Sequence, residues 1–360
     1  MKNNKKILLV NPFAIGDILS STSLIEELRR KFPHCFIGYM CNRRVASIVE
    51  SNPKIDEVFI FEKNEYKKRW RVSRIKCIWS FLKFLRLIQK KKFNLVIDLS
   101  LGDRYSFFFK LLGIPKRVGF NYKGRGRFQT HKLDIPGFEE KHVVEYYFEL
   151  LKFIGIDGKP PPLKAYLKED DIKWAEEFLK DNNVTDNDLL IGIDPAGGES
   201  FGPQADIKRW PIEYFAALSD QFISQLNAKI IILVGPKEKE VVDKIRSLMQ
   251  YTPIDASQSS IMQMAALMKK SSLIICNDTG PMRFANAFEK KVVALFGPTD
   301  DKVYGCYPSH ERNRVLKKEN LSCRPCYKKF RIPKCEYNKR CLTEITVDEV
   351  FEAGKNLLSG

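Results

Sequence analysis

One polar turn in the second half of the chain has the residue types of an anion-binding site. Residues 273–276 are apolar in the manner of a buried parallel strand, and Asn-Asp-Thr-Gly follows at 277–280. Proline and apolar residues at helical spacing then occupy 281–288, before a second apolar run at 292–296. The order predicts a turn at the carboxyl end of a parallel strand, where backbone N–H groups and the helix dipole favour a phosphate. The pattern alone fits a capped structural turn equally well.

A carboxylate near the amino terminus is the second candidate for chemistry. Residues 7–11 predict a short buried strand, and a turn leads from Pro12 to Asp17, where helical spacing begins. Asp17 is the right type for a helix N-cap, which is the simpler interpretation. A carboxylate at a helix start that faces a cleft could also accept a proton from a hydroxyl group.

Two further segments offer cations and a carboxylate that suit a nucleotide. Lys208 and Arg209 precede Trp-Pro at the start of a helix predicted for 212–226. Glu238 follows a strand at 230–234, at a sheet edge where ligands collect, and would suit a ribose hydroxyl. A surface charge for the cations and a dipole-complementing role for Glu238 are the alternatives.

Length, composition and net charge limit the kinds of protein that this chain could be. The chain has 360 residues, of which 44% are hydrophobic, so it is long enough for two domains with separate cores. No apolar run approaches the ~20 residues of a spanning helix, and the amino terminus lacks a signal-peptide pattern, which indicates a cytoplasmic protein. The net charge of +17 favours a polyanionic partner such as nucleic acid, an anionic membrane or a phosphorylated substrate.

The positions of the candidate residues require a particular architecture. Predicted strands at 7–11, 35–40, 57–61, 95–98 and 117–119 alternate with helices, as in a doubly wound parallel sheet. A stiff Pro-rich linker near 157–162 ends this part, and a second alternating series follows it. We therefore expect an α/β chain with domains at 1–160 and 161–345. In one interpretation the final helix, 346–360, returns to the first domain.

A basic segment within the first domain has a different character. Lys and Arg between 67 and 92 surround an apolar set at helical spacing: Ile75, Ile78, Trp79, Leu82, Leu85 and Ile88. A basic amphipathic helix that carries tryptophan is typical of membrane surfaces. The alternative is a helix whose apolar stripe faces the core and whose outer side is basic.

The tail concentrates cysteines. Cys323 and Cys326 form a C-x2-C pair, and Cys335 and Cys341 follow. Four thiolates could form a structural zinc site, although the second spacing is looser than in zinc ribbons. Reduced or locally disulfide-linked packing cysteines are the other interpretation.

Two long stretches resemble glycosyltransferase family 9, the ADP-heptose:lipopolysaccharide heptosyltransferases. They are NDTGPMRFANAF with VVALFGPTD in the second half, and ILLVNPFAIGDILSSTSLIEELRRKFP at the amino terminus. The K-R-W-P segment and the cysteine-rich tail fall in the family's order as well. The resemblance therefore covers nearly the whole chain.

The resemblance implies roles for the candidate residues. It assigns the catalytic base to Asp17 and the donor diphosphate to Lys208, with Arg209 beside it. It places Asp278, Thr279 and Gly280 at the nucleotide sugar. Arg283 stands where the family usually has histidine. A cation there could still meet a phosphate.

The fold implied is GT-B, two Rossmann-like doubly wound domains that face a central cleft, with the acceptor on the first domain and the nucleotide sugar on the second. The function implied is metal-independent, inverting transfer of heptose from ADP-heptose to lipopolysaccharide core or a related anionic glycolipid. It requires no cofactor, and implies peripheral contact with the cytoplasmic face of the inner membrane. One alternative is a family member that has lost catalysis and only binds a sugar nucleotide. Another is a nucleic-acid-binding protein, which the charge alone suggests. A third is an NAD-dependent oxidoreductase, which would need a G-x-G-x-x-G fingerprint after the first strand.

Overall fold

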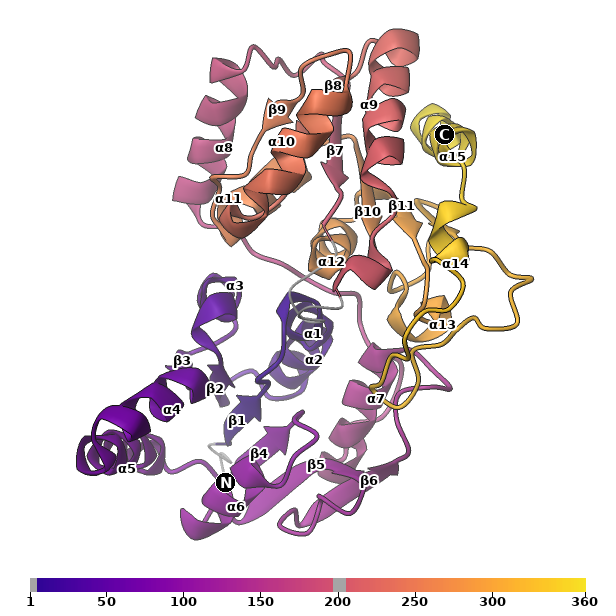
Figure 1. Cartoon of the computed structure of the whole chain (residues 1–360). Coiled ribbons are helices and arrows are strands. Elements are labelled where there is room, and N and C mark those ends of the chain that lie inside the picture. The colour runs from indigo at the N-terminus through magenta and orange to yellow at the C-terminus, as the bar shows by residue number, and fades with distance from the viewer. Residues whose placement is uncertain (1–4, 197–204) are drawn as a thin grey trace. The chain divides into compact units, whose positions relative to one another are not determined.

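The computed structural model describes residues 5–196 and 205–360. It separates into two compact units, the first made of Met1–Gly137 with Val144–Pro161 and the second of Phe138–Val143 with Pro162–Gly360 (Figure 1). The main division falls within the Pro-rich linker. A short piece near 140 belongs to unit 2, which the sequence did not indicate.

Unit 1 is built on a six-stranded sheet in which every neighbouring pair of strands is parallel. The strands are β1 (Lys6–Val10), β2 (Phe36–Cys41), β3 (Glu57–Ile60), β4 (Leu95–Asp98), β5 (Lys116–Tyr122) and β6 (His131–Ile135). The helices are α1 (Ile15–Ser20), α2 (Thr22–Lys31), α3 (Ala46–Glu50), α4 (Lys63–Val72), α5 (Arg74–Lys91), α6 (Arg104–Leu111) and α7 (Val143–Glu149). After its first residue, Lys6, the central strand β1 is buried, as its apolar run from Ile7 to Val10 requires.

Unit 2 has a second six-stranded parallel sheet. Its strands are β7 (Leu190–Asp194), β8 (Lys229–Ile232), β9 (Ile254–Asp255), β10 (Leu273–Asn277), β11 (Lys291–Leu295) and β12 (Asn313–Leu316). Its helices are α8 (Glu169–Asp181), α9 (Ile212–Leu226), α10 (Lys239–Leu248), α11 (Ile261–Lys270), α12 (Gly280–Ala287), α13 (Asp301–Tyr304), α14 (Arg340–Thr343) and α15 (Val347–Ser359).

The two sheets share one topology. Their strand orders are β3-β2-β1-β4-β5-β6 and β9-β8-β7-β10-β11-β12, so each unit has the order 3-2-1-4-5-6 of a dinucleotide-binding fold. The winding direction reverses between β1 and β4 in unit 1, and between β7 and β10 in unit 2. In such sheets ligands bind outside the carboxyl ends of the strands at this reversal. The fold therefore predicts one binding edge in each unit.

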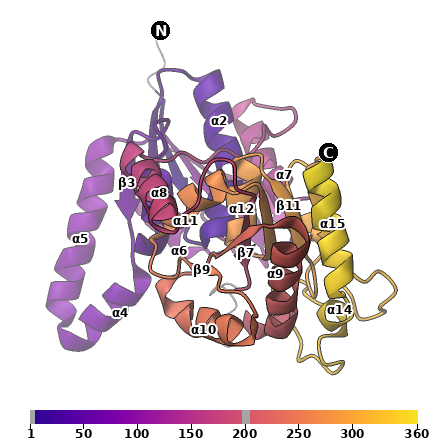
Figure 2. The same cartoon turned by 90° about the horizontal axis from the view of Figure 1, so that it is seen from above.

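The C-terminal helix belongs to unit 2. A capping box between Thr346 and Glu349 starts α15, and Val350, Phe351 and Leu357 are buried in the core of unit 2. The Phe351 ring lies 4.9 Å from that of Phe222 on α9, and α9 and α15 lie side by side in both views (Figures 1 and 2). The structure thus groups this helix with the second domain and gives no support to its return to the first.

The basic segment 67–92 forms two helices, with Ser73 capping the second. The side chains of α5 that pack inward are Cys77, Phe81, Phe84 and Ile88, which recur every three or four residues. Of the apolar set that the sequence singled out, only Ile88 is fully buried. Helix α5 therefore faces the core, as that alternative expects, but mainly through residues outside the named set, whose members Ile75, Ile78, Trp79 and Leu82 are exposed.

Candidate active site

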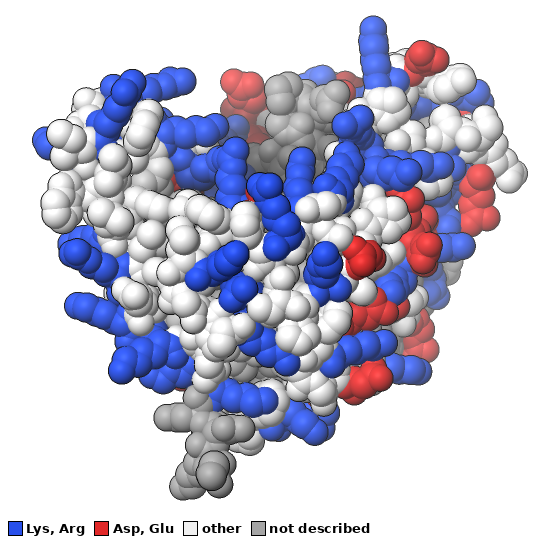
Figure 3. Space-filling model, turned by 90° about the horizontal axis from the view of Figure 1, so that it is seen from below, with Lys and Arg blue, Asp and Glu red and all other residues white. Residues whose placement is uncertain are grey.

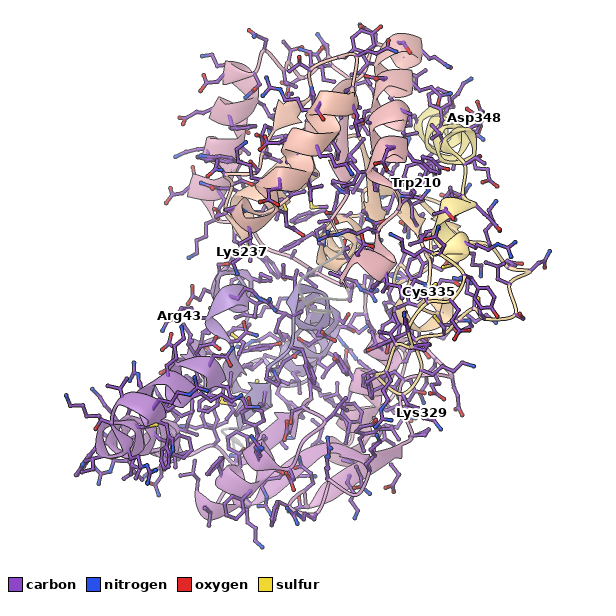
Figure 4. The ribbon with its side chains drawn as sticks, in the orientation of Figure 1. Arg43, Trp210, Lys237, Lys329, Cys335 and Asp348 are labelled. Carbon is purple, nitrogen blue, oxygen red and sulfur yellow. The ribbon has the colours of Figure 1, made fainter. Side chains whose placement is uncertain are left out.

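The binding edge of unit 2 joins two segments that lie far apart in the sequence. Asn277, the last residue of β10, is fully buried, and its side-chain oxygen accepts the backbone N–H of Trp210 at 3.0 Å. Its amide nitrogen donates to the carbonyls of Pro195 and Ala196, which follow β7. Asn277 therefore fixes the K-R-W-P segment against the ends of β7 and β10. Figure 4 shows Trp210 at the start of α9.

A buried ion pair lies next to this asparagine. The Lys208 ammonium group contacts Asp278 Oδ2, with both side chains less than a tenth exposed. The same carboxylate oxygen accepts the hydroxyl of Thr299 at 2.7 Å. Burial of a lone ammonium or carboxylate would be costly, so each charge requires the other. An ammonium group has three N–H donors, and can hold this carboxylate and an anionic ligand together.

The turn before α12 is held by a buried acid. Thr279 is the N-cap of α12 by position, yet its hydroxyl makes no cap and donates to Asp194 Oδ2 at 2.5 Å. The other oxygen of Asp194 accepts the N–H of Ala196 at 3.1 Å. Burial raises the pKa of Asp194 to about 7, because the low-dielectric interior disfavours its charged form. The backbone N–H groups at the start of α12 lie at the carboxyl edge of β10, where an anion gains from the helix dipole.

The binding edge of unit 1 carries the second carboxylate. Asp17 is the third residue of α1, whose N-cap is Ala14, so the N-cap interpretation of Asp17 is wrong. The hydroxyl of Tyr147, a fully buried side chain on α7, donates to Asp17 Oδ1 at 3.1 Å. Asn11, directly after β1, donates to the Asp17 backbone carbonyl at 3.0 Å. Two side chains from separate elements thus hold this partly exposed residue in place.

A buried carboxyl also stands at the winding reversal of unit 1. Asp98 ends β4 and accepts the Ser100 N–H at 3.0 Å and the Gln129 side-chain N–H at 3.1 Å. Burial raises its pKa to about 7, as for Asp194.

A family model described as glycosyltransferase family 9 (heptosyltransferase) matches residues 81–336. The chain belongs to glycosyltransferase family 9. Lipopolysaccharide core heptosyltransferase OpsX of Haemophilus influenzae is 22% identical to it, over 98% of this chain and 97% of its own length. A solved family 9 glycosyltransferase from Veillonella parvula superposes with a TM-score of 0.83 at 27% identity, covering 99% of this chain and 98% of its own.

Membership in family 9 confirms the resemblance inferred from the sequence and makes the chain a glycosyltransferase. The Escherichia coli ADP-heptose LPS heptosyltransferase II, with a TM-score of 0.77 at 20% identity over 98% of both chains, shares the fold. The predicted α/β class of two Rossmann-like GT-B domains is confirmed.

The remaining donor candidates of this family 9 enzyme lie along the same edge of unit 2. Arg209 and Glu238, which lies between β8 and α10, form an ion pair at 3.3 Å. The buried Nε of Arg209 has no hydrogen-bond partner within residues 5–196 and 205–360. Gly280 begins α12 directly after Thr279. The glycine-rich loop predicted near 195–203 falls mostly outside the described residues.

Arg283 has partners of its own. Its guanidinium group donates to the carbonyls of Gly305 and Tyr304, the latter at 2.9 Å, and is almost fully buried. The ring of His142 lies 3.1 Å away and stacks on Tyr307. Burial, and secondly the Arg283 charge, lower the pKa of His142 to about 3, so this imidazole is neutral at physiological pH. A phosphate contact by Arg283 remains a prediction, and it would compete with these carbonyls.

The four tail cysteines gather around one cavity in unit 2. Cys323, Cys326, Cys335 and Cys341 all line it, and each is a free thiol. Cys335 (Figure 4) accepts the Lys339 N–H at its sulfur. Among the described residues no group of three or more His, Cys, Asp or Glu side chains has a metal-binding arrangement. Whether these thiols hold zinc therefore remains a prediction.

Several side chains of the site were not found from the sequence. Asp194 and Thr299 hold the predicted turn, and Tyr147 holds Asp17. Asp194 could have been found from the sequence, because it is a carboxylate at the end of an apolar strand. Tyr147 could not, since 130 residues separate it from its partner.

Proposed function

We propose that this enzyme transfers heptose from ADP-heptose to a lipopolysaccharide-core acceptor with inversion at the anomeric carbon. Asp17 takes the proton from an acceptor hydroxyl, whose oxygen forms a new bond to the anomeric carbon. The bond from that carbon to the β-phosphate oxygen breaks, and ADP leaves with the electron pair. The observation that carries the proposal is the convergence of Lys208 with Asp278 and Thr279 at the reversal of the second sheet.

Unit 2 supplies stabilisation of the leaving group in this proposal. The diphosphate gains negative charge as its bond to the sugar breaks, and Lys208 and the N–H groups at the start of α12 are positioned donors. Arg209 adds a second cation, and its buried Nε, which lacks a partner within the described part of the chain, suits a phosphate oxygen. Glu238 would receive the ribose hydroxyl. No step in this scheme uses a metal ion or a resident cofactor.

The acceptor defines where the enzyme works. OpsX of Haemophilus influenzae bears the name of a lipopolysaccharide core heptosyltransferase, and an acceptor of that kind is an anionic glycolipid. No helix within the described residues has the length and apolar content to cross a membrane. We assign the enzyme to the cytoplasmic face of the inner membrane as a peripheral protein, without specific nucleic-acid binding.

The test is acceptor-dependent release of ADP. The purified chain is incubated with ADP-heptose and a deacylated lipopolysaccharide-core acceptor, with UDP-sugars and NAD as control donors. We expect ADP release only with both substrates present, unchanged by a metal chelator. Release from a different sugar nucleotide would refute the donor. Binding of ADP-heptose without any release would instead establish a lapsed enzyme.

A further inference from the structure

We propose that α4 and α5 form a docking surface for a bilayer rich in anionic lipid. This inference deepens the proposed function by naming the surface through which the enzyme meets its lipid-borne acceptor. Both helices lie at the outer side of unit 1, beyond β3 (Figures 1 and 2). Their sequence, their exposed side chains and their packing support the same conclusion.

Exposed apolar side chains are concentrated on these helices. Of the twelve exposed large hydrophobic residues among the described ones, half fall within 70–82. They are Trp70, Val72, Ile75, Ile78, Trp79 and Leu82. Val72 is 87% exposed, Ile75 70% and Trp79 61%. Soluble monomers seldom group apolar side chains in this way unless the group binds something.

Folding does not explain these exposed residues. The core of unit 1 already receives an apolar stripe from α5, consisting of Phe84 and Ile88 with Cys77 and Phe81 beside them. The exposed residues 75, 78, 79 and 82 form a second stripe at helical spacing. A helix with one stripe facing the core and another facing outward has a surplus apolar face. That face is available for a partner.

The charge around this face selects the partner. Residues 63–92 contain twelve Lys or Arg and a single Glu, so they hold eleven of the chain's +17 net charges. The left side of Figure 3, where α4 and α5 lie, shows white atoms bordered by Lys and Arg. Anionic headgroups attract such a rim, while apolar side chains and tryptophan enter the interfacial region. A second copy of this face would repel the first, and nucleic acid gives no reason for the exposed aliphatic side chains.

Side-chain contacts join the two helices into one hairpin. Arg69 on α4 donates to the Ser80 hydroxyl on α5 at 2.6 Å. The Cys77 thiol donates to the Tyr66 carbonyl at 3.4 Å. The ring of Tyr66 on α4 packs edge-on against that of Phe81 on α5, with centroids 5.8 Å apart. The two helices therefore present their exposed apolar side chains from one packed hairpin.

The test is flotation of the full chain with vesicles of phosphatidylcholine, with or without phosphatidylglycerol. We expect binding only to the vesicles with phosphatidylglycerol, weakened by high salt. Ile75→Ser with Trp79→Ser should weaken it on the order of tenfold or more, because two side chains lose their burial in the bilayer. Replacing Lys67, Lys68 and Arg71 by Gln should cost on the order of fivefold per cation.

A matched control distinguishes binding by this surface from nonspecific binding of exposed apolar residues to vesicles. Leu248 and Tyr251 are exposed on unit 2, and the pair Leu248→Ser with Tyr251→Ser should leave flotation unchanged. Equal losses in the two double variants would overturn the proposal. Absence of flotation with both kinds of vesicle would overturn it as well. So would a chain that binds RNA but no vesicles, if the double variant Ile75→Ser with Trp79→Ser still binds the RNA.

Turnover distinguishes failure of this inference from failure of the proposed function. With a deacylated, soluble acceptor, Ile75→Ser with Trp79→Ser should keep the ADP release of the unmodified chain. With the acceptor embedded in vesicles, its release should fall in step with its flotation. Normal release from both acceptors would retain the glycosyltransferase chemistry and refute the docking surface. If the unmodified chain floats with the vesicles but releases no ADP from either acceptor, the docking surface is retained and the glycosyltransferase chemistry is refuted.

Discussion

The two units share one strand order but carry opposite chemistry at their binding edges. At the edge of unit 1, Asp17 is a partly exposed carboxylate that accepts a hydrogen bond from Tyr147, and Asn11 donates to its backbone carbonyl. At the edge of unit 2, Lys208 is buried and held by the charge of Asp278. In the proposed mechanism, the first edge removes a proton and the second binds an anion. A shared topology thus positions a site without deciding its function.

The two edges also share one feature. Each has a buried carboxyl at the winding reversal, Asp98 in unit 1 and Asp194 in unit 2, and burial raises the pKa of both to about 7. Both accept hydrogen bonds from a backbone N–H two residues further along. These acids bind loops and not ligands in our account. The difference between the units therefore lies in the residues that the loops present.

The largest effect is expected from removing the proton acceptor of unit 1. Asp17→Asn keeps the size and most hydrogen bonds of the side chain but cannot take a proton. We expect turnover to fall about 10²–10⁴-fold, the usual range for a general base. Steady-state ADP release measures this. A loss below threefold would remove Asp17 from the mechanism.

The corresponding change in unit 2 removes the cation. Lys208→Ala should lower kcat on the order of 10²–10³-fold, as for loss of one preorganised charge donor. It also leaves Asp278 buried without its ion-pair partner, so the variant's melting temperature must be recorded. Lys208→Ala combined with Asp278→Asn relieves that unpaired charge. If the double variant recovers both stability and turnover, Lys208 is structural only.

The buried acids predict a particular dependence of stability on pH. The pKa of Asp194 is about 7 in the folded chain and about 3.9 when unfolded, so the folded state binds the extra proton. Its contribution is complete below pH ~4 and is lost as pH rises through about 7. Relative to Asp194→Asn, the unmodified chain should lose up to about 4 kcal/mol over this range. Denaturant unfolding at several pH values measures the difference, and a difference that is independent of pH would contradict it.

The smallest effect is expected from removing the hydrogen bond that Tyr147 donates to Asp17. Tyr147→Phe removes one hydroxyl from a buried ring and leaves the packing unchanged. Turnover should fall a few-fold, in line with a single hydrogen bond to a charged group. The acidic limb of the pH–rate profile should also move to higher pH, because the ionised carboxylate loses a donor. An unchanged profile would leave Tyr147 a purely structural role.

Much of this architecture could be predicted from local pattern. The apolar runs located β4 and β10, and the Pro-rich linker located the main division between the units. Strand β6 was missed, because its sequence, His-Lys-Leu-Asp-Ile, alternates polar residues typical of a half-exposed edge and resembles a charged loop. Helix α5 was predicted, but its buried face was not, since the helix has two apolar stripes and periodicity cannot rank them.

The residues of the candidate site also fall into those that local sequence reveals and those that it does not. The motif residues Asp278 and Thr279 were recognisable because they follow a strand and begin a helix. Their partners are Asp194, which ends β7, and Thr299, which lies in the turn after β11, and no local signal pairs them. The environment of Arg283 was equally hidden, because His142 lies 141 residues away in the sequence. Contacts between distant segments depend on tertiary packing, which one sequence does not encode locally.

In the proposed mechanism, unit 1 performs the proton transfer while unit 2 binds the donor. Calorimetric titration of ADP-heptose into Asp17→Asn, beside the unmodified chain, tests it most directly. We predict the same Kd for both proteins, although the variant has lost its turnover. A Kd for Asp17→Asn that is weaker by tenfold or more would show that Asp17 binds the donor, and the proposed division of roles between the two units would be wrong.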